Sequence, residues 1–274
     1  MTAIQTAKTA LSSQSFALEI RRLCLTESKR ANVGHIGSAL SIAELVAVLY
    51  WQILNIPSTR DPERDRFILS KGHAVLALYA ALHLKGFMSR ETLATFCEDN
   101  SALGGHPEIG VDGIDFATGS LGMGLSFGTG AALAAKRAGA NRRAFVLVSD
   151  AELNEGSLWE SALFAGHHQL SNLVAIVDQN GQQALGYTKE ILDTDSVEQK
   201  FKAFNWRTHV VDGHDCDQLE KILKELDYKS GQPHAIIAKT TFGKGVSFME
   251  NQIQWHYLPM NDAQFEQAMK EIEC

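Results

Sequence analysis

Cysteine and proline are scarce in this sequence of 274 residues, which contains four and five of them respectively. The sequence has no Cys-x-x-Cys pair, so it favours neither a disulfide framework nor a zinc knuckle, and it fits a reducing cytoplasm. The scattered cysteines are Cys24, Cys97, Cys216 and Cys274. No Pro-rich, Gly/Ser-rich or low-complexity linker and no internal repeat interrupts the chain. We therefore expect residues 1–274 to form one domain.

Long apolar runs and an excess of positive charge are absent as well. The first eight residues, Met-Thr-Ala-Ile-Gln-Thr-Ala-Lys, lack the apolar core of a signal peptide, and no run is long enough to span a bilayer. The 25 basic and 32 acidic residues leave a net charge of −7. This acidity argues against a nucleic-acid partner, although a local nest of N–H groups can still bind a phosphorylated substrate. We expect a cytoplasmic protein that binds neither membranes nor nucleic acid.

Short apolar runs that alternate with helical patterns predict the fold class. Residues 144–148, Ala-Phe-Val-Leu-Val, are too few for a helix and indicate a strand buried on both faces. Further strands are expected at 66–69, 173–177, 208–211 and 234–238. Helices are expected at 15–31, from 41 to about 53, at 74–84, from the 119–130 region to 140, and at 157–168, 196–204 and 215–226. The alternation implies an α/β fold, a doubly wound, mainly parallel sheet with helices on both faces.

Three local patterns carry more specific expectations. Ser41 and Glu44 match a capping box, so a helix is expected to begin at Ser41 and to bury an apolar stripe. The members of that stripe are Ile42, Leu45, Val46, Leu49 and Ile53. Residues 100–115 are expected to form a long loop that carries His106, and loops of that length in compact domains are often functional. Residues 181–195 are expected to form a polar loop.

Polar side chains follow two successive strands. Asp150 comes just after the strand at 144–148, and Asn180 comes just after the strand at 173–177. In a right-handed crossover the two strands are parallel, so both side chains emerge at the same edge of the sheet. Carboxylate and amide oxygens suit magnesium and not zinc, and a helix beginning near Gly156 favours an anion such as a diphosphate. The structural alternative is that Asp150 caps a helix and Asn180 precedes a turn at Gly181.

Other candidates have equally plain alternatives. His73 falls where a strand meets a helix, a position in which histidine is more often structural than a ligand. The glycine-rich segment 119–130 permits close helix packing as readily as close approach of a ligand. Lys244 follows the last expected strand, where it either meets a phosphate or is solvated.

The segment from Ser149 to Asn180 resembles the thiamin diphosphate motif, which in its usual form begins Gly-Asp-Gly and ends in Asn. Here Ser149 and Ala151 replace the two glycines, and Asp150 and Asn180 are retained. The run Glu-Leu-Asn-Glu-Gly at 152–156, followed by Trp-Glu at 159–160, resembles transketolases specifically.

Five further motifs resemble the same family and occur in its order, so the resemblance extends from about residue 15 to 258. The motifs are Gly-His-Ile-Gly at 34–37, Ser-Lys-Gly-His-Ala at 70–74, Gly-His-Pro-Glu at 105–108, Thr-Gly-Ser-Leu-Gly-Met-Gly at 118–124, and Thr-Thr-Phe-Gly-Lys-Gly at 240–245 with His256 beyond it. Ile36 follows His35 where many transketolases have proline.

The resemblance implies a thiamin diphosphate-binding fold and a magnesium ion, or another divalent cation such as Ca²⁺ or Mn²⁺. The implied metal ligands are Asp150, Asn180 and the main-chain carbonyl of Gln182. The implied cofactor contacts are His73, Gly119, Ser120, Leu121, Asp150, Ala151, Glu155, Asn180, Lys244 and His256. The implied catalytic residues are His73 and His256 near the diphosphate and reactive carbon, and His35 and His106 near the donor's hydroxyls and carbonyl.

The resemblance also implies a transferase that moves a two-carbon ketol unit from a ketose, phosphorylated or not, to an aldose acceptor. Single-chain transketolases are more than twice this length, so the chain is expected to be the N-terminal subunit of a split enzyme. Its partner would be a C-terminal subunit with the pyrimidine-binding domain, in an α2β2 assembly. Glu155 and Glu160 fall where the family places acidic residues at the subunit interface, although plain helix-start charge is the alternative. Pentose phosphates, branched sugar phosphates and sulfonated sugars are all compatible substrates.

Two other classes stay open. One is a subunit of a different thiamin enzyme, of the 2-oxoacid decarboxylase or dehydrogenase type, which the His73 and His106 motifs disfavour. The other is a non-catalytic subunit that keeps the fold, which the replacement of the motif glycines by Ser149 and Ala151 supports.

Overall fold

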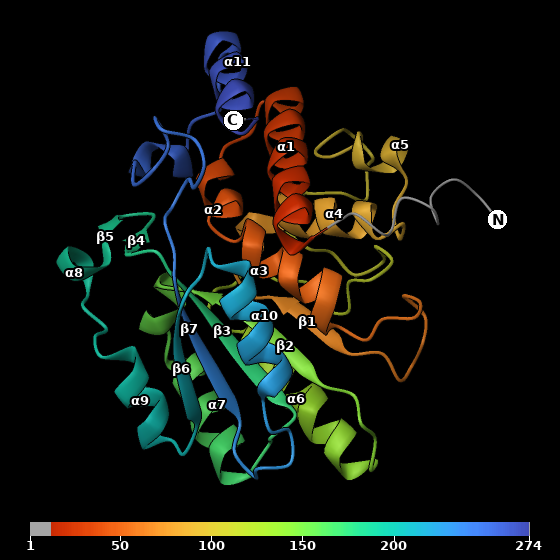
Figure 1. Ribbon diagram of the computed structural model, residues 1–274, viewed down its shortest axis with the longest axis vertical. Helices are drawn as coiled ribbons and strands as arrows, with labels where there is room; N and C mark the ends of the chain where they lie inside the picture. The colour runs from red at the N-terminus through yellow and green to blue at the C-terminus, as the bar shows by residue number, and fades with distance from the viewer. Residues whose placement is uncertain (1–11, 274) are drawn as a thin grey trace.

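A five-stranded parallel sheet forms the centre of the computed structural model, which describes residues 12–273 (Figure 1). The first eight residues, expected to hold no signal peptide, and Cys274 lie outside the described residues. The strand order is β1-β2-β3-β7-β6. The strands are β1 (Arg66–Leu69), β2 (Ala144–Ser149), β3 (Leu173–Gln179), β6 (Arg207–Asp212) and β7 (His234–Lys239). The predicted α/β fold class is confirmed, and this sheet is entirely parallel.

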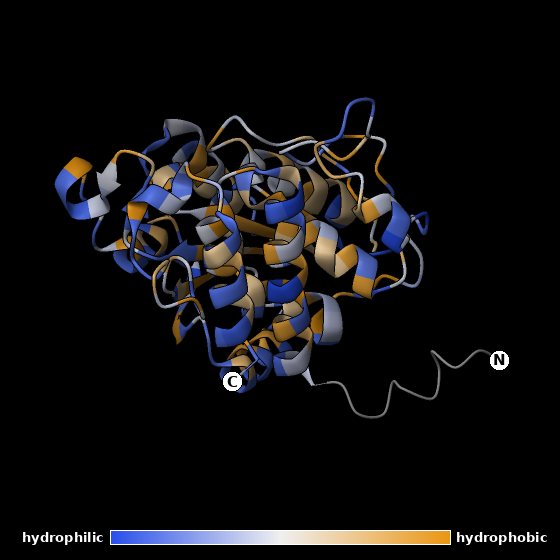
Figure 2. Ribbon diagram, turned by 90° about the horizontal axis from the view of Figure 1, so that it is seen from above, coloured by the Kyte–Doolittle hydropathy of each residue, from blue (hydrophilic) through white to orange (hydrophobic). Residues whose placement is uncertain are grey.

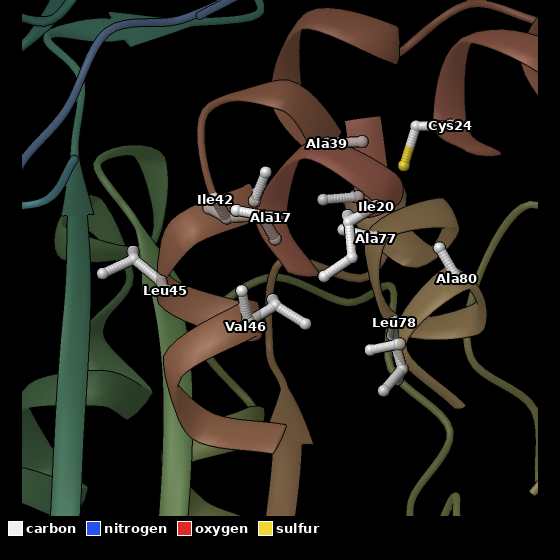
Figure 3. Packing of buried hydrophobic residues seen from close by; sticks show 14 of the residues in the cluster. Ala17, Ile20, Cys24, Ala39, Ile42, Leu45, Val46, Ala77, Leu78 and Ala80 are labelled. Carbon is white, nitrogen blue, oxygen red and sulfur yellow. The ribbon is translucent and has the colours of Figure 1, made fainter. Parts of the chain in front are cut away.

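Helices cover both faces of the sheet because successive strand residues point to opposite sides. Val146 of β2 belongs to the core beneath α6 (Gly124–Arg137), α7 (Gly156–His167) and α9 (Val197–Ala203). Its neighbour Leu147 belongs to the opposite core, beneath α1 (Ser13–Ala31), α3 (Ala43–Val48), α4 (Val75–Leu84) and α10 (Cys216–Glu225). Figure 3 shows Ile20 of α1 and Ala77 of α4 close together in this second core. Every residue of β2 is buried, as expected for a strand covered on both sides.

Smaller elements complete the described chain. They are α2 (Ile36–Leu40), α5 (Arg90–Leu93), α8 (Thr188–Ile191), α11 (Asp262–Glu271), a two-stranded sheet of β4 (Gln182–Gln183) and β5 (Gly186–Tyr187), a π-type turn at Leu49–Ile53, and 3-10 turns at Gly72–Ala74, Ala151–Asn154 and Ile253–His256. In Figure 2 apolar segments run through the middle of the molecule, while many outer helical turns are hydrophilic. Among residues 12–273, no helix combines the length and the apolar character that crossing a membrane requires.

The predicted capping box at Ser41 is wrong. Helix α2 ends at Leu40, α3 begins at Ala43, and the N-cap residue Ile42 makes no side-chain cap bond. Both side chains bind buried partners instead. Ser41 Oγ donates a hydrogen bond to Asp178 Oδ2 at 2.8 Å, and Glu44 forms an ion pair with Arg21 at 2.6 Å. The predicted apolar stripe is confirmed, since all five of its residues are buried.

The prediction of a polar loop at 181–195 is wrong for residues 182–191. Residues 182–187 form the β4–β5 hairpin, and α8 follows it directly and projects beyond the main sheet (Figure 1). Gly181 permits the turn into the hairpin because its φ is 76°, and its carbonyl accepts the N–H of Thr188 at 2.9 Å. The hairpin therefore begins two residues after Asn180, so Gln182 lies near the carboxyl end of β3.

Candidate functional site

A cavity of about 200 Å³ lies at the carboxyl edge of β2 and β3. It brings together most of the residues that the motifs single out, although they come from seven separate segments of the chain. The lining residues that the sequence predicted are His35, His73, His106, Gly119, Leu121, Ala151, Asn180, Gln182 and His256. The lining residues that the sequence reasoning missed are Ser38, Lys71, Ser149, Gln183 and Ala184.

Three of the four histidines form a triangle. The ring centroids of His35 and His73 are 5.4 Å apart, those of His73 and His256 are 6.0 Å apart, and those of His35 and His256 are 6.2 Å apart. The N–H of His35 donates to the carbonyl of His256 at 3.2 Å, which ties two distant segments together. Gly34 permits this contact, since a Cβ there would lie 2.5 Å from the carbonyl oxygen of Tyr257.

The environment keeps these imidazoles uncharged. Burial lowers the pKa of His73 well below its usual value, and the nearby Lys71 lowers it further. Burial and then Lys71 lower the pKa of His256 to about 4. Burial and then His106 lower the pKa of His35. Neutral imidazoles have one donor and one acceptor nitrogen, so near pH 7 each can donate one hydrogen bond to a bound ligand and accept another.

A buried ion pair supports the edge of the cavity. Lys71 Nζ lies 2.5 Å from Asp178 Oδ2, and both residues are fully buried. Asp178 also accepts bonds from the hydroxyls of Ser41 and Thr240 and, at 3.0 Å, from Nδ2 of Asn180. The last bond fixes the Asn180 amide, whose Oδ1 accepts the N–H of Gln182 at 2.9 Å. Asp178 was missed in the sequence, where the only signal is one carboxylate at the end of an apolar strand.

The residues around Asp150 fit a divalent cation bound through oxygen. Asp150 is 1% exposed, and burial followed by the Asp178 carboxylate raises its pKa to about 7. Lys71, whose charge lowers the pKa of Asp150, is already paired with Asp178, so an ionised Asp150 needs a further positive charge. Both side-chain polar atoms of Gln182 are buried and have no hydrogen-bond partner among residues 12–273. Within residues 12–273 no three His, Cys, Asp or Glu side chains form a metal cluster, so a hard cation with amide and carbonyl ligands suits the site better than zinc.

The glycine-rich segment packs closely against the cavity. A Cβ on Gly119 would lie 3.2 Å from the ring of His106. Gly122 has a φ of 84°, and a Cβ there would lie 2.5 Å from Cβ of Glu155. The contact at Gly122 requires glycine, and both glycines meet protein atoms, so the distances favour the close-packing interpretation of this segment, while Gly119 also lines the cavity.

Four predicted contacts do not line the cavity. One is Asp150, which is 1% exposed and lies in the chain between the lining residues Ser149 and Ala151. Ser120 and Glu155 do not line it, and Glu155 is the N-cap residue of α7. Lys244 lines a different, open hollow beside His214, and its Nζ lies 3.5 Å from a carboxylate oxygen of Glu250. The structure therefore favours the solvated interpretation of Lys244.

Comparison with known proteins gives one consistent answer. The family model described as "Transketolase, thiamine diphosphate binding domain" matches residues 12–273. The chain is 41% identical to one of the subunits of the apulose-4-phosphate transketolase of Phocaeicola vulgatus, over 89% of this chain and 87% of that protein. It is 38% identical to 6-deoxy-6-sulfo-D-fructose transketolase subunit SqwG of Clostridium sp., over 93% of this chain and 94% of that protein.

Single-chain enzymes are matched over a smaller part of their length. The chain is 38% identical to human transketolase over 93% of its own residues, which span 41% of the human protein. The crystal structure of transketolase from Campylobacter jejuni superposes with a TM-score of 0.89 at 32% identity, covering 95% of this chain and 42% of that chain. The chain thus spans about two fifths of these longer relatives.

Proposed function

The chain belongs to the transketolase family, and we propose that it is the N-terminal subunit of a two-component transketolase. In this proposal the assembled enzyme transfers a two-carbon ketol unit from a ketose donor to an aldose acceptor. The observation that carries the proposal is the convergence of His35, His73, His106 and His256 on one cavity beside Asp150.

The proposed cofactor is thiamine diphosphate with Mg²⁺, or with another divalent cation such as Ca²⁺ or Mn²⁺. Asp150, Asn180 and the main-chain carbonyl of Gln182 would hold the metal ion at the ends of β2 and β3. Gly119 and Leu121 would face the aminopyrimidine ring. The bound cofactor supplies the electron sink that allows the carbon–carbon bond next to the ketose carbonyl to break.

The histidines of this chain would bind the substrate and move protons. The Nε2 atom of His256 is buried and makes no hydrogen bond among the described residues, so it is available to a ligand. The Nε2 atom of His73 lies 2.7 Å from the hydroxyl of Ser38, which orients the ring. Low pKa values keep these rings neutral, so each can hydrogen-bond a donor hydroxyl or an acceptor oxygen in the geometry that proton transfer requires.

The proposed partner is a separate C-terminal subunit that carries the pyrimidine-binding domain, in an α2β2 assembly. Two relatives named as transketolase subunits are matched over 87% and 94% of their own length, which supports this division. We further propose that residues 1–274 are one transketolase N-terminal domain and that the enzyme is cytoplasmic. Glu155 and Glu160 are the candidate interface carboxylates. Sugars and sugar phosphates are the proposed substrates.

The proposal is tested by turnover in a reconstituted complex. The chain is mixed with the product of the neighbouring open reading frame, thiamine diphosphate and Mg²⁺. The sugars in the names of two relatives, apulose 4-phosphate and 6-deoxy-6-sulfo-D-fructose, are assayed first as donors, together with ordinary ketose phosphates. Ketol transfer that needs both chains and is lost in His73→Ala supports the proposal. Pyruvate turnover without ketol transfer points to a 2-oxoacid enzyme, and no turnover with any donor overturns the proposed activity.

A further inference from the structure

Glu152 is a buried carboxylate for which the proposed chemistry has no role. It lies in the 3-10 turn that directly follows Asp150, and it is fully buried. It does not line the cavity. Burial raises its pKa, while hydrogen bonds from Ser70, Gly122 and Ser149 oppose that shift. A buried carboxylate costs free energy of folding unless both of its oxygens are hydrogen-bonded, so the hydrogen bonds of Glu152 indicate its role.

The two oxygens of Glu152 accept bonds from three separate segments. Oε1 accepts the hydroxyl of Ser70 and, at 2.9 Å, the backbone N–H of Gly122. Oε2 accepts the backbone N–H of Ser149 at 2.9 Å. Each segment also carries residues that line the cavity, His73 in the first, Gly119 and Leu121 in the second, and Ser149 itself in the third.

A second bond strengthens the same junction. Ser70 Oγ donates to Glu152 and accepts the N–H of Gly124 at 3.1 Å. The glycine-rich segment is thus held at both Gly122 and Gly124 by one connected group of polar atoms. The end of β2 has other restraints, because Ser149 is in register with Asp178 of β3 and Asp150 Oδ2 accepts the N–H of Gly181 at 2.6 Å. Loss of the Glu152 carboxylate would therefore release the glycine-rich segment more than the metal end of the cavity.

We propose that Glu152 is a positioning residue that sets the spacing between the Asp150 end of the cavity and the end formed by Gly119–Gly122. The proposal deepens the proposed function and rests on it for the identity of the ligand. Thiamine diphosphate spans both ends of the cavity in that assignment, whereas pyrophosphate reaches only the metal end. The two ligands consequently respond differently when the spacing is no longer fixed.

The test compares Glu152→Gln with the native full-length chain. Glutamine keeps the shape of the side chain but replaces one acceptor oxygen by an NH₂ donor, so either Gly122 or Ser149 loses its acceptor. Glu266→Gln, on an exposed position of α11, is the matched control. Ser70→Ala is a second variant that removes one donor and leaves the carboxylate, in case Glu152→Gln does not fold.

Three measurements are made on each protein. Titration calorimetry with thiamine diphosphate and Mg²⁺, in the mixture with the product of the neighbouring open reading frame, is expected to show a ~10–100-fold weaker affinity for Glu152→Gln, the scale of losing a hydrogen bond to a charged group. Titration with pyrophosphate and Mg²⁺ is expected to show a far smaller change. Amide hydrogen exchange of the ligand-free chain is expected to speed up at residues 119–124 and not at β7. Ser70→Ala should show the same pattern with smaller changes in affinity and in exchange rate, and Glu266→Gln should match the native chain.

The outcomes separate this inference from the proposed function. Equal weakening of both ligands, or unchanged exchange at 119–124, overturns the positioning role and indicates a general effect on stability. If the native chain binds thiamine diphosphate and Glu152→Gln binds it equally well, the positioning role alone is wrong. If the native chain binds no thiamine diphosphate, alone or with its partner, the proposed function fails, and the exchange data still decide whether Glu152 holds the segment.

Discussion

Lys71 Nζ lies 2.5 Å from Asp178 Oδ2, and the two residues form a fully buried ion pair at the carboxyl edge of β3. Lys71 contributes in two ways to the cavity. It neutralises the carboxylate that orients the Asn180 amide, and its charge keeps the pKa of His73 and the pKa of His256 low. One lysine thus links the metal end of the cavity to its neutral histidines.

Removal of this lysine is expected to destabilise the protein. In Lys71→Met the Asp178 carboxylate stays buried without its counter-ion, which costs about 3–5 kcal/mol of unfolding free energy for pairs of this kind. Lys189→Met, at an exposed position on α8, is the control and is expected to change the unfolding free energy by less than about 0.5 kcal/mol. Urea denaturation measures both variants. A loss below about 1 kcal/mol for Lys71→Met, the scale of an exposed pair, would contradict the buried-pair account.

The low pKa of His256 predicts a dependence of stability on pH. Its pKa is lowered to about 4 in the folded chain, mainly by burial, against about 6.5 when unfolded. Between these values the unfolded chain binds more protons, so the contribution of His256 is complete above about pH 6.5 and is lost as the pH falls through about 4. The shift corresponds to about 3 kcal/mol.

The measurement is urea denaturation of the native chain and of His256→Asn between pH 4 and pH 7, without cofactor. Asp150 acts in the opposite direction, because its pKa is raised to about 7 in the folded chain, and the comparison of the two proteins cancels its effect. The advantage of the native chain over His256→Asn is expected to grow as the pH rises through this range. An advantage that stays constant with pH would show that the ring is not held neutral by burial.

Two glycines of the same region are expected to respond in opposite ways to alanine. In Gly122→Ala the positive φ and the contact with Glu155 both oppose a side chain, so the unfolding free energy should fall by more than about 1 kcal/mol. Gly130 lies within α6, and a Cβ at this position would meet no atom within 4 Å. Because alanine favours a helix interior over glycine, Gly130→Ala should raise the unfolding free energy by about 0.5–1 kcal/mol. Thermal or urea denaturation of the isolated chain measures the pair, and equal effects would count against the close packing of Gly122 on Glu155.

The sequence predicted four strands of the sheet well because β1, β2, β3 and β7 are short, largely apolar runs that are almost entirely buried. The fifth strand, β6, has only one buried residue. The run at 144–148 is fully buried in β2, and the crossover to β3 places Asp150 one residue past the Ser149–Asp178 register pair. The parallel crossover from β2 to β3 was therefore enough to predict that Asp150 and Asn180 lie at the same edge of the sheet.

Interactions between distant segments could not be predicted in the same way. Ser41 and Glu44 have the sequence of a capping box, but Asp178, which lies 137 residues away, takes the hydroxyl of Ser41. Lys71 is separated from Asp178 by 107 residues, and nothing in its neighbourhood marks it as buried. The hairpin at 182–187 has strands of only two residues, too short to give an alternating pattern.

The most direct test of the central claim is calorimetric titration of thiamine diphosphate with Mg²⁺ into this chain alone and into its mixture with the product of the neighbouring open reading frame. We predict weak binding to the chain alone, tight binding in the mixture, and loss of both in Asp150→Ala, since that carboxylate is the only charged side chain proposed as a ligand of the metal. If the native protein binds no thiamine diphosphate in both samples, the proposed function is wrong. The chain would then be a protein that keeps the fold without the cofactor.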